Sequence, residues 1–379
     1  MRILIVGAGI GGMTFAALLR QRGFEPVVVE RAKDFGHAGY MLSLYPLGSR
    51  ILHGIGLYDA FVAASQPVDT YQVGDGHGRI IKRFDLGELV RAAGPLLQIM
   101  RGDLLALLCT AAKGVDLRMG VSAVNVTDGT TGARVRFSDS SEGEFDLVVA
   151  ADGMHSVMRE SFFGRAPGKE TGWGVWVWLA KPDILPPTLV AEYWGAGRFV
   201  GLYPTRGALG VVAGGPEREI GPGAIDRDAA ELRRRFALLD ASLGPCFDAL
   251  PASTGGMFFW KLHDRRAPTW RAGRVALLGD SACGFLPTAG VGASMAMESA
   301  AVLADELGRT DAAGIPRALA LYEARRRKRA EAAQGDSRKL AAMMMIENPY
   351  LARLRNEALR FYSVRSLVKN IVAALDSPI

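Results

Sequence analysis

The sequence has few of the residues that build disulfide frameworks and metal centres. Its 379 residues include three cysteines and five histidines. Cys109, Cys246 and Cys283 are widely spaced and form no Cys-X-X-Cys motif, so we expect no disulfide framework and a reducing compartment. The histidines lack metal-ligand spacing, and we therefore predict no metal site.

A leader and long apolar runs are also lacking. The chain begins directly with MRILIVGAG, and no apolar run reaches the roughly 18–20 residues of a membrane span. We therefore expect a soluble, cytoplasmic protein with no membrane span.

Positive charge is spread along the chain and concentrates only once. The net charge is +6, and the dense run covers residues 325–329. Glutamates and alanines surround this run, so we predict a solvated helix face. No aromatic residues are interleaved with it, which disfavours a nucleic-acid partner.

What the chain does contain is enough apolar residues for a large core. Hydrophobic residues make up 49% of the sequence, which suits two domains or one α/β domain with a substrate lobe. RILIVG and EPVVVE are typical of buried parallel strands, and GGMTFAALLRQRG between them has helical spacing with a stop at Gly23. Residues 40–65 and 101–113 carry further helical patterns, and FDLVVAADG at 145–153 predicts another buried strand.

A glycine-rich turn joins the first strand to the first helix. Gly7 allows the tight turn, Gly9 lets the backbone approach a diphosphate, and Gly12 lets the helix pack close to the strand. The diphosphate would lie on the free N–H groups of the helix start. Glu30 ends the second strand, where a carboxylate accepts ribose hydroxyls. The predicted dinucleotide contacts here are Gly7, Gly9, Ile10, Gly11, Gly12, Glu30 and Arg31. This unit alone does not separate FAD from NAD.

Two further loops follow predicted strands of the same sheet. ADGMHSVMR contains Asp152, and GDSACGFLPTAGVGAS contains Gly279, Asp280, Pro287, Gly290 and Gly292 before a helix. Ligands of α/β folds bind at the carboxyl ends of such strands. An aspartate in the third loop would repel a phosphate but can accept from a sugar-alcohol chain. Asp152 is equally well explained as a turn residue that accepts from its own loop.

The sequence pattern changes from Trp173 onward, where residues alternate and aromatic and turn residues are frequent. WGVWVWLAK, LVAEYWGAGRFVGLYPT and GALGVVAGG favour antiparallel strands, and IDRDAAELRRRFALL favours a helix. RVALLGD then returns to the buried-strand pattern, and the tail from about 317 is helical with an interruption near Pro349.

With its three spaced motifs, nearly the whole chain resembles the single-component (group A) FAD-dependent aromatic hydroxylases and monooxygenases of the p-hydroxybenzoate hydroxylase type. The resemblance implies an α/β fold: a Rossmann-like FAD-binding domain (GR2-type, three-layer), an inserted and mostly antiparallel β-sheet substrate domain, and C-terminal helices. The corresponding boundaries are 1–70, 96–172 and 268–330 for the FAD-binding domain, 71–95 and 173–267 for the substrate-binding domain, and 331–379 for a C-terminal helical cap.

The resemblance also implies a chemistry and further contacts. FAD would be the cofactor, NADPH or NADH the co-substrate, and a flavin C4a-hydroperoxide would hydroxylate an aromatic or polycyclic small molecule. Asp280 would contact the ribityl chain, and Arg101 corresponds to an arginine that touches FAD. Cys283, Ser294 and Ser299 depart from residues common in the family, and we expect Cys283 to be a small packed residue.

Substrate contacts and competing functions remain open at this stage. We name Arg50, Trp176, Trp178, Tyr193 and Tyr203 as candidate substrate contacts, with ordinary core packing or a surface role as their alternative. No catalytic residue is nominated. The C-terminal helices are similar to the cap of tetracycline-inactivating monooxygenases, although packing against the FAD domain is favoured. The alternatives are a reductase or dehydrogenase of the same fold and a non-catalytic flavoprotein. We expect the protein to be a monomer or a homodimer.

Overall fold

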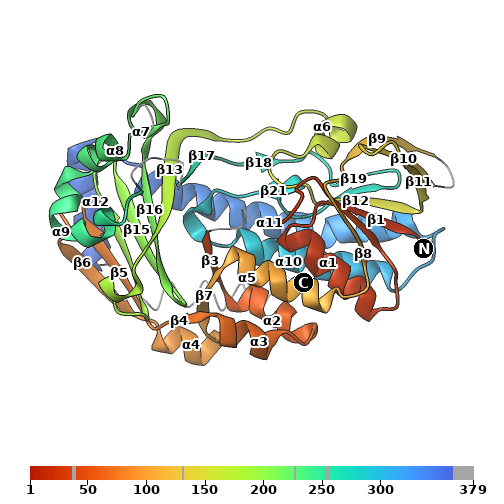
Figure 1. The fold of residues 1–379 in the computed structure, drawn as a ribbon, viewed down its shortest axis with the longest axis horizontal. Coiled ribbons are helices and arrows are strands. Elements are labelled where there is room, and N and C mark those ends of the chain that lie inside the picture. The colour runs from red at the N-terminus through yellow and green to blue at the C-terminus, as the bar shows by residue number, and fades with distance from the viewer. Residues whose placement is uncertain (36–39, 130–131, 226–227, 252–256, 362–379) are drawn as a thin grey trace.

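The structure is a computed structural model. It describes residues 1–35, 40–129, 132–225, 228–251 and 257–361. The molecule is elongated, with one large sheet near each end (Figure 1).

The N-terminal half of the fold is built on a six-stranded sheet. Its strands are, in order, β19 (Arg271–Ala272), β20 (Val275–Leu277), β12 (Leu147–Ala150), β1 (Ile3–Val6), β2 (Val27–Glu30) and β8 (Asp116–Met119). Neighbours pair in parallel except β19 with β20. Every residue of β1, β12 and β20 is buried, as expected of parallel strands covered on both faces.

Helices and a small meander cover this sheet. Helix α1 (Ile10–Gln21) lies between α5 (Arg101–Ala111) and α10 (Gly292–Leu307) and contacts both. The strands β9 (Ala123–Asp128), β10 (Ala133–Phe137) and β11 (Glu142–Phe145) form an antiparallel sheet that packs into the same core. The α/β prediction for this part is confirmed.

The second large sheet has seven strands. They are, in order, β17 (Phe258–His263), β13 (Glu170–Ala180), β16 (Ala208–Pro216), β15 (Phe199–Thr205), β14 (Leu189–Trp194), β5 (Thr70–Asp75) and β6 (Ile80–Asp85). Only β14 and β5 pair in parallel, so the sheet is mostly antiparallel, as predicted. The strands β5 and β6 come from a separate excursion of the chain, and join β14 at one side of the sheet.

The two faces of this sheet pack against different partners. One face forms a core with α7 (Glu217–Ile220), α8 (Ala229–Arg235) and α9 (Ala237–Asp248). The other face meets Leu286, from the loop after β20, and the end of α11 (Ile315–Met344). This second face is therefore the one turned toward the FAD-binding half.

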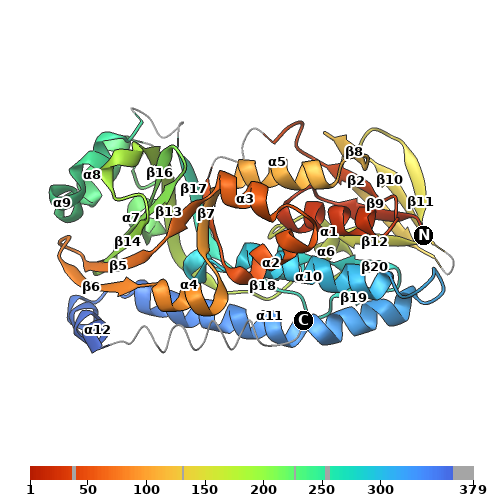
Figure 2. The same cartoon turned by 90° about the horizontal axis from the view of Figure 1, so that it is seen from below.

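The long helix α11 runs beneath both halves of the molecule (Figure 2). It continues through residue 330, so the expected boundary at 330/331 falls inside one helix. After a turn at residues 345–348, α12 (Pro349–Phe361) packs on β6 at the edge of the seven-stranded sheet. The packing of α12 is thus on the second sheet, not on the FAD half. Residues 362–379 of the predicted cap lie outside the described residues.

The remaining elements connect the two halves. They are β3 (Met41–Leu44), α2 (Pro46–Gly54), α3 (Tyr58–Ala64), β4 (Gln66–Val68), α4 (Gly87–Ala93), β7 (Leu96–Met100), α6 (Val157–Phe163), β18 (Arg265–Arg266) and β21 (Cys283–Gly284). The helical prediction for residues 40–65 missed β3. This strand pairs with β7, and both belong to the connection between the two large sheets. No helix in the described ranges combines the length and apolar character needed to cross a bilayer.

The arginine run of α11 is only in part the solvated face that the sequence predicts: Lys328 is exposed, whereas Arg326 and Arg329 pair with a buried carboxylate. Arg326 is completely buried, and its Nη1 lies 2.9 Å from Oε2 of Glu298 on α10, which is also completely buried. Arg329 contacts the same Oε2 at 3.0 Å, and Arg50 of α2 contacts Oε1 at 2.5 Å. One buried carboxylate therefore holds three arginines and joins three helices.

We predict that Glu298→Gln lowers the free energy of unfolding by roughly 3–5 kcal/mol, because it leaves buried guanidinium groups without their counter-charge. The measurement is urea unfolding followed by far-UV circular dichroism. Glu331→Gln is the matched control on α11, since Glu331 pairs with Arg327 at a partly exposed position, and we expect a loss below about 1 kcal/mol there. Equal losses for the two variants would contradict the prediction.

Candidate cofactor and substrate site

The first glycine-rich loop is shaped by close backbone contacts on one side and open space on the other. Gly7 has φ +107°, and a Cβ there would lie 2.5 Å from the carbonyl oxygen of Ala151. A Cβ on Gly12 would lie 2.0 Å from the Gly7 oxygen, whereas a Cβ on Gly9 would meet no heavy atom within 4 Å. Gly7 and Gly12 are thus required by the fold, and Gly9 leaves room for a ligand at the start of α1.

Glu30 is held beside this loop. Its Oε2 accepts from the Ala8 N–H at 2.8 Å, and its Oε1 accepts from the Ala32 N–H at 2.9 Å. Each carboxylate oxygen keeps a further lone pair, so the group can still accept from ribose hydroxyls. Of the neighbouring predicted contacts, Ile10 and Gly11 are partly exposed at the start of α1, and Arg31 is exposed.

The second loop carries a carboxylate with one satisfied oxygen. Oδ2 of Asp152 accepts from the Met158 N–H at 3.2 Å, as the turn interpretation requires. Oδ1 is buried and has no hydrogen-bond partner within the described ranges. Burial raises the pKa of Asp152 above its ordinary value, against the hydrogen bonds from Ser156 and Met158 that lower it. A buried acceptor without a partner suits a ligand hydroxyl.

A buried arginine ties the second loop to the third. Arg159 donates from Nη1 to the Ser281 carbonyl at 3.1 Å and from Nη2 to the Met154 carbonyl at 2.8 Å. Ser281 in turn donates to the carbonyl of Ala150 at the end of β12. The two loops are therefore fixed relative to each other and to the ends of β12 and β20.

Asp280 lies between two arginines at this junction. Burial raises its pKa to about 6, while the charges of Arg101 and Arg159 oppose the shift. Arg101 is the first residue of α5, and its guanidinium lies 5.5 Å from the centre of the Tyr40 ring. The structure thus brings together Arg101 and Asp280, which the sequence separates by almost half the chain.

The third loop ends at a helix start. Gly279 has φ +68° and Gly290 has φ +63°, and Pro287 opens a short 3-10 turn between them. Helix α10 begins at Gly292 with no acidic residue in its first turn. Its N–H groups and positive dipole end are therefore available to a negatively charged or polar ligand.

The residues present fit FAD. The open side of Gly9 suits the diphosphate, Glu30 suits the adenosine ribose, and Asp280 with the α10 start suits the ribityl chain and flavin. The unpartnered Oδ1 of Asp152 and the desolvated Asp280 are the groups that gain most from hydroxyl partners.

The candidate substrate residues separate onto two faces of the seven-stranded sheet. Trp176, Trp178 and Tyr193 are buried in the core with α7–α9, and the first two donate to the Ile220 and Cys246 carbonyls. Their expected role as substrate contacts is therefore corrected: strand alternation turns them away from the FAD-binding half. Tyr203 belongs to the opposite face.

Arg50 is likewise accounted for by structure. Its guanidinium contacts Glu298 between α2 and α10, which explains it as a positioning residue for these helices. The three departures from the family pattern are also buried. Cys283 is a packed residue, as expected, and burial raises its pKa to about 12. Ser299 donates to the Met295 carbonyl, and Ser294 is buried on α10 with no hydrogen-bond partner in the described part of the chain.

Sequence reasoning missed a polar cluster on the face that carries Tyr203. Glu192 is 7% exposed and accepts from the Tyr71 hydroxyl at 2.6 Å, the Tyr203 hydroxyl at 2.7 Å and the Trp194 Nε1 at 2.9 Å. Tyr45 lies between this cluster and the third loop, since a Cβ on Gly290 would be 3.4 Å from its ring. The available signal was one glutamate inside the otherwise apolar strand LVAEYW.

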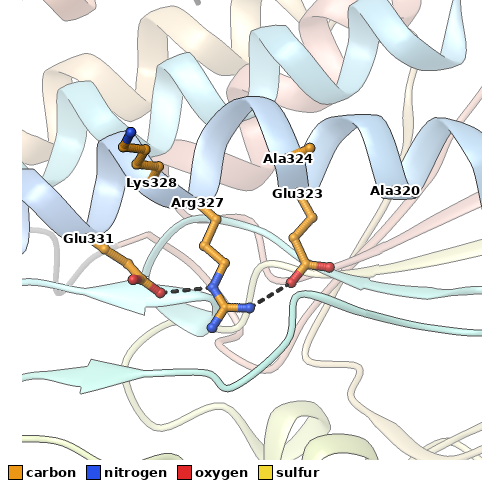
Figure 3. Close-up of a pocket in the computed structure, with 6 residues that line it drawn as sticks. All are labelled: Ala320, Glu323, Ala324, Arg327, Lys328 and Glu331. Atoms are coloured by element: carbon orange, nitrogen blue, oxygen red, sulfur yellow. Dashed lines mark hydrogen bonds and ion pairs between the residues drawn. The ribbon is translucent and has the colours of Figure 1, made fainter.

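A surface hollow on the exposed side of α11 is a separate feature. It is lined by Ala320, Glu323, Ala324, Arg327, Lys328 and Glu331 (Figure 3). Arg327 pairs within it with Glu323 at 3.2 Å and Glu331 at 2.9 Å. All of its lining comes from one helix, and none of it comes from the three loops, so we assign it no part in the cofactor site.

Comparison with known proteins agrees with this geometry. The model of the FAD binding domain family matches residues 1–337. A 3-amino-4-hydroxybenzoate 2-monooxygenase from Streptomyces cremeus is 33% identical over 90% of this chain and 87% of its own length.

Solved structures share the fold over the whole chain. HpxO from Klebsiella pneumoniae, solved with FAD and uric acid, has a TM-score of 0.90 at 25% identity and covers 100% of this chain and 97% of its own. The tetracycline destructase Tet(55) has a TM-score of 0.76 at 22% identity over 100% and 98% of the two chains, which shows a common fold. The chain belongs to the FAD binding domain family, and within it to the FAD-dependent aromatic monooxygenases that it resembles in sequence.

Proposed function

We propose that this protein uses NADPH or NADH and O2 to hydroxylate an aromatic or polycyclic small molecule held between the third loop and the second sheet. The observation that carries the proposal is the meeting of three loops at the ends of β1, β12 and β20, directly facing a sheet face with a polar cluster. Bound FAD supplies the redox chemistry, taking two electrons from the nicotinamide and activating oxygen.

The chain's own residues bind, orient and exclude water. We propose that Gly7, Gly9, Gly12 and Glu30 hold the AMP half, and that Asp152, Asp280 and Arg101 hold the middle and the ribityl chain. The start of α10 would stabilise negative charge on a bound flavin. Leu286 and the aromatic residues of the second sheet face limit water around the substrate.

The proposed substrate-binding unit consists of residues 71–95 and 173–267. Its support is the pairing of β5 with β14, which brings both segments into one sheet. The names of the relatives leave two kinds of substrate open: an aromatic carboxylate, as in the 3-amino-4-hydroxybenzoate enzyme, and a heterocycle without a carboxylate, as in the uric acid complex.

The test of this function is oxygen incorporation. With a hydroxylatable phenol and 18O2, we expect NAD(P)H consumption and one labelled oxygen atom in the product, measured by mass spectrometry. NAD(P)H consumption with hydrogen peroxide as the sole oxygen product across a broad phenol panel would favour the reductase alternative. Absence of flavin reduction by either nicotinamide would favour a non-catalytic flavoprotein.

We predict that Gly9→Ala weakens FAD binding about tenfold or more, because its methyl group projects into the space proposed for the diphosphate. The unfolding midpoint should not change, since no heavy atom lies within 4 Å of that methyl position. Titration of the apoprotein with FAD, followed by flavin fluorescence, gives the affinity. Gly335→Ala is the control, because it also adds a methyl group in open space but lies on α11. Wild-type affinity in Gly9→Ala would rule out a diphosphate at this position.

We predict a pH-dependent stability difference between the wild type and Asp280→Asn in the FAD-free protein. The folded-state pKa of Asp280 is about 6, above the ordinary 3.8, so the folded state keeps its proton to a higher pH than the unfolded state. Stability from this group is therefore present at low pH and is lost between about pH 4 and about pH 6. Relative to Asp280→Asn, the wild type should lose roughly 3 kcal/mol across that window. Urea unfolding at a series of pH values measures it, and parallel curves would contradict it.

A further inference from the structure

The cluster around Glu192 places several polar groups on the sheet face that meets the third loop. Gly201 on β15 is the cross-strand partner of Glu192 on β14. The Tyr203 ring lies over Gly201, where a Cβ would be 2.5 Å from the ring. Gly201 thus clears a path for the ring. Tyr71 approaches Glu192 from β5 on the other side, and Trp194 from the same strand. Three donors therefore converge on one carboxyl group, the pattern expected of an ionised acceptor.

The tyrosines in and beside the cluster are only partly buried. Tyr45, Tyr71 and Tyr203 all retain accessible surface, although burial raises the pKa of each one, and raises that of Tyr45 to about 12. Tyr45 also adjoins Gly290 of the third loop, so the cluster lies on the side of the sheet that meets the proposed flavin end of the site.

No positive charge within the described residues balances Glu192. It forms no ion pair there, and burial raises its pKa against three hydrogen bonds, with no basic side chain acting on it. Arg355 lies over the Trp194 ring at 5.6 Å, but its guanidinium donates to the main-chain carbonyls of Trp194 and Met343. Burial alone lowers its pKa, to about 10, with no contribution from a carboxylate.

The protons of the two tyrosine hydroxyls are committed to Glu192. Each hydroxyl has one proton and two lone pairs, so Tyr71 and Tyr203 can offer a ligand only acceptors. A ligand there must bring N–H or O–H donors. An aromatic carboxylate brings acceptors and a negative charge, and would meet an uncompensated carboxylate in a region of low dielectric.

Resting on the proposed function, we propose that Glu192, Tyr71 and Tyr203 determine substrate specificity: the protein takes aromatic substrates that present hydroxyl or N–H donors to this cluster, and rejects aromatic carboxylates. The substrate class is thus a phenol or N-heterocycle without a carboxylate group. The role of Glu192 is to fix both tyrosine hydroxyls as acceptors.

The test compares matched ligands that differ in one group. The pairs are 3-amino-4-hydroxybenzamide with 3-amino-4-hydroxybenzoate, and 4-hydroxybenzamide with 4-hydroxybenzoate. Dissociation constants come from the change that each ligand causes in the absorption spectrum of the FAD-loaded protein. We expect each amide to bind at least about tenfold more tightly than its carboxylate.

Variants then assign the discrimination to the cluster. Glu192→Gln should narrow the ratio of dissociation constants about tenfold, because the amide group donates one hydrogen bond and frees one tyrosine hydroxyl to donate to a carboxylate. Tyr203→Phe should weaken amide binding without improving carboxylate binding, since it removes an acceptor. Glu217→Gln is the control: it lies on α7, which covers the other face of the sheet, and pairs with Lys261, and it should keep the wild-type ratio.

The outcomes separate this inference from the proposed function. A preparation that binds no FAD would contradict the proposed function itself. FAD-loaded wild type that prefers the carboxylates, or responds to neither amide, overturns the inference alone. An unchanged ratio in folded, FAD-loaded Glu192→Gln also overturns it, and if that variant does not fold, the Tyr203→Phe result decides in the same way.

Discussion

The buried carboxylate of Glu298 is the constraint on which the arrangement of the site depends. It joins α2, α10 and α11 through Arg50, Arg326 and Arg329. The start of α10 faces the proposed flavin position, α2 follows directly after Tyr45, and α11 runs under both sheets (Figure 2). A charged group this deeply buried is costly unless all partners are in place. The same contacts therefore tie α10, which follows the third loop, to α11, whose end packs on the second sheet.

A second set of contacts fixes the loops at the strand ends. Arg159 and Ser281 connect the second and third loops through main-chain carbonyls, and Gly7 approaches the Ala151 carbonyl closely enough to exclude any side chain. Loops held in this way lose little conformational freedom when a cofactor binds, which is the physical basis of a preformed site. The hydrogen-bonding capacity left over is at Asp152 and Asp280, where a ligand with hydroxyl groups is needed.

The sequence was most informative where local rules decide the structure. β1, α1 and β2 followed from apolar runs and three glycines, and the antiparallel sheet followed from alternation and turn residues. Local patterns could not reveal which face of that sheet meets the FAD half, so they left open whether Trp176, Trp178 and Tyr193 contact a substrate or pack in the core, where the structure places them. Local patterns also could not reveal that Arg326 is buried. A basic run on a helix gives the same sequence pattern whether its side chains are solvated by water or paired with a carboxylate on another helix. Single charged residues within apolar segments, Glu192 and Glu298, were the signals that local rules could not interpret.

Glu192 and Glu298 show why buried charge has two different consequences in one protein. Glu298 is surrounded by guanidinium groups, so its charge is compensated and its effect is on the position of helices. Glu192 has hydroxyl and indole donors in place of cations, so its charge is solvated but not neutralised. An excess negative charge at this position carries a desolvation cost that no structural contact requires. That cost is best explained by ligand selection, because a compensated or apolar residue would support the same strand with a smaller loss of stability.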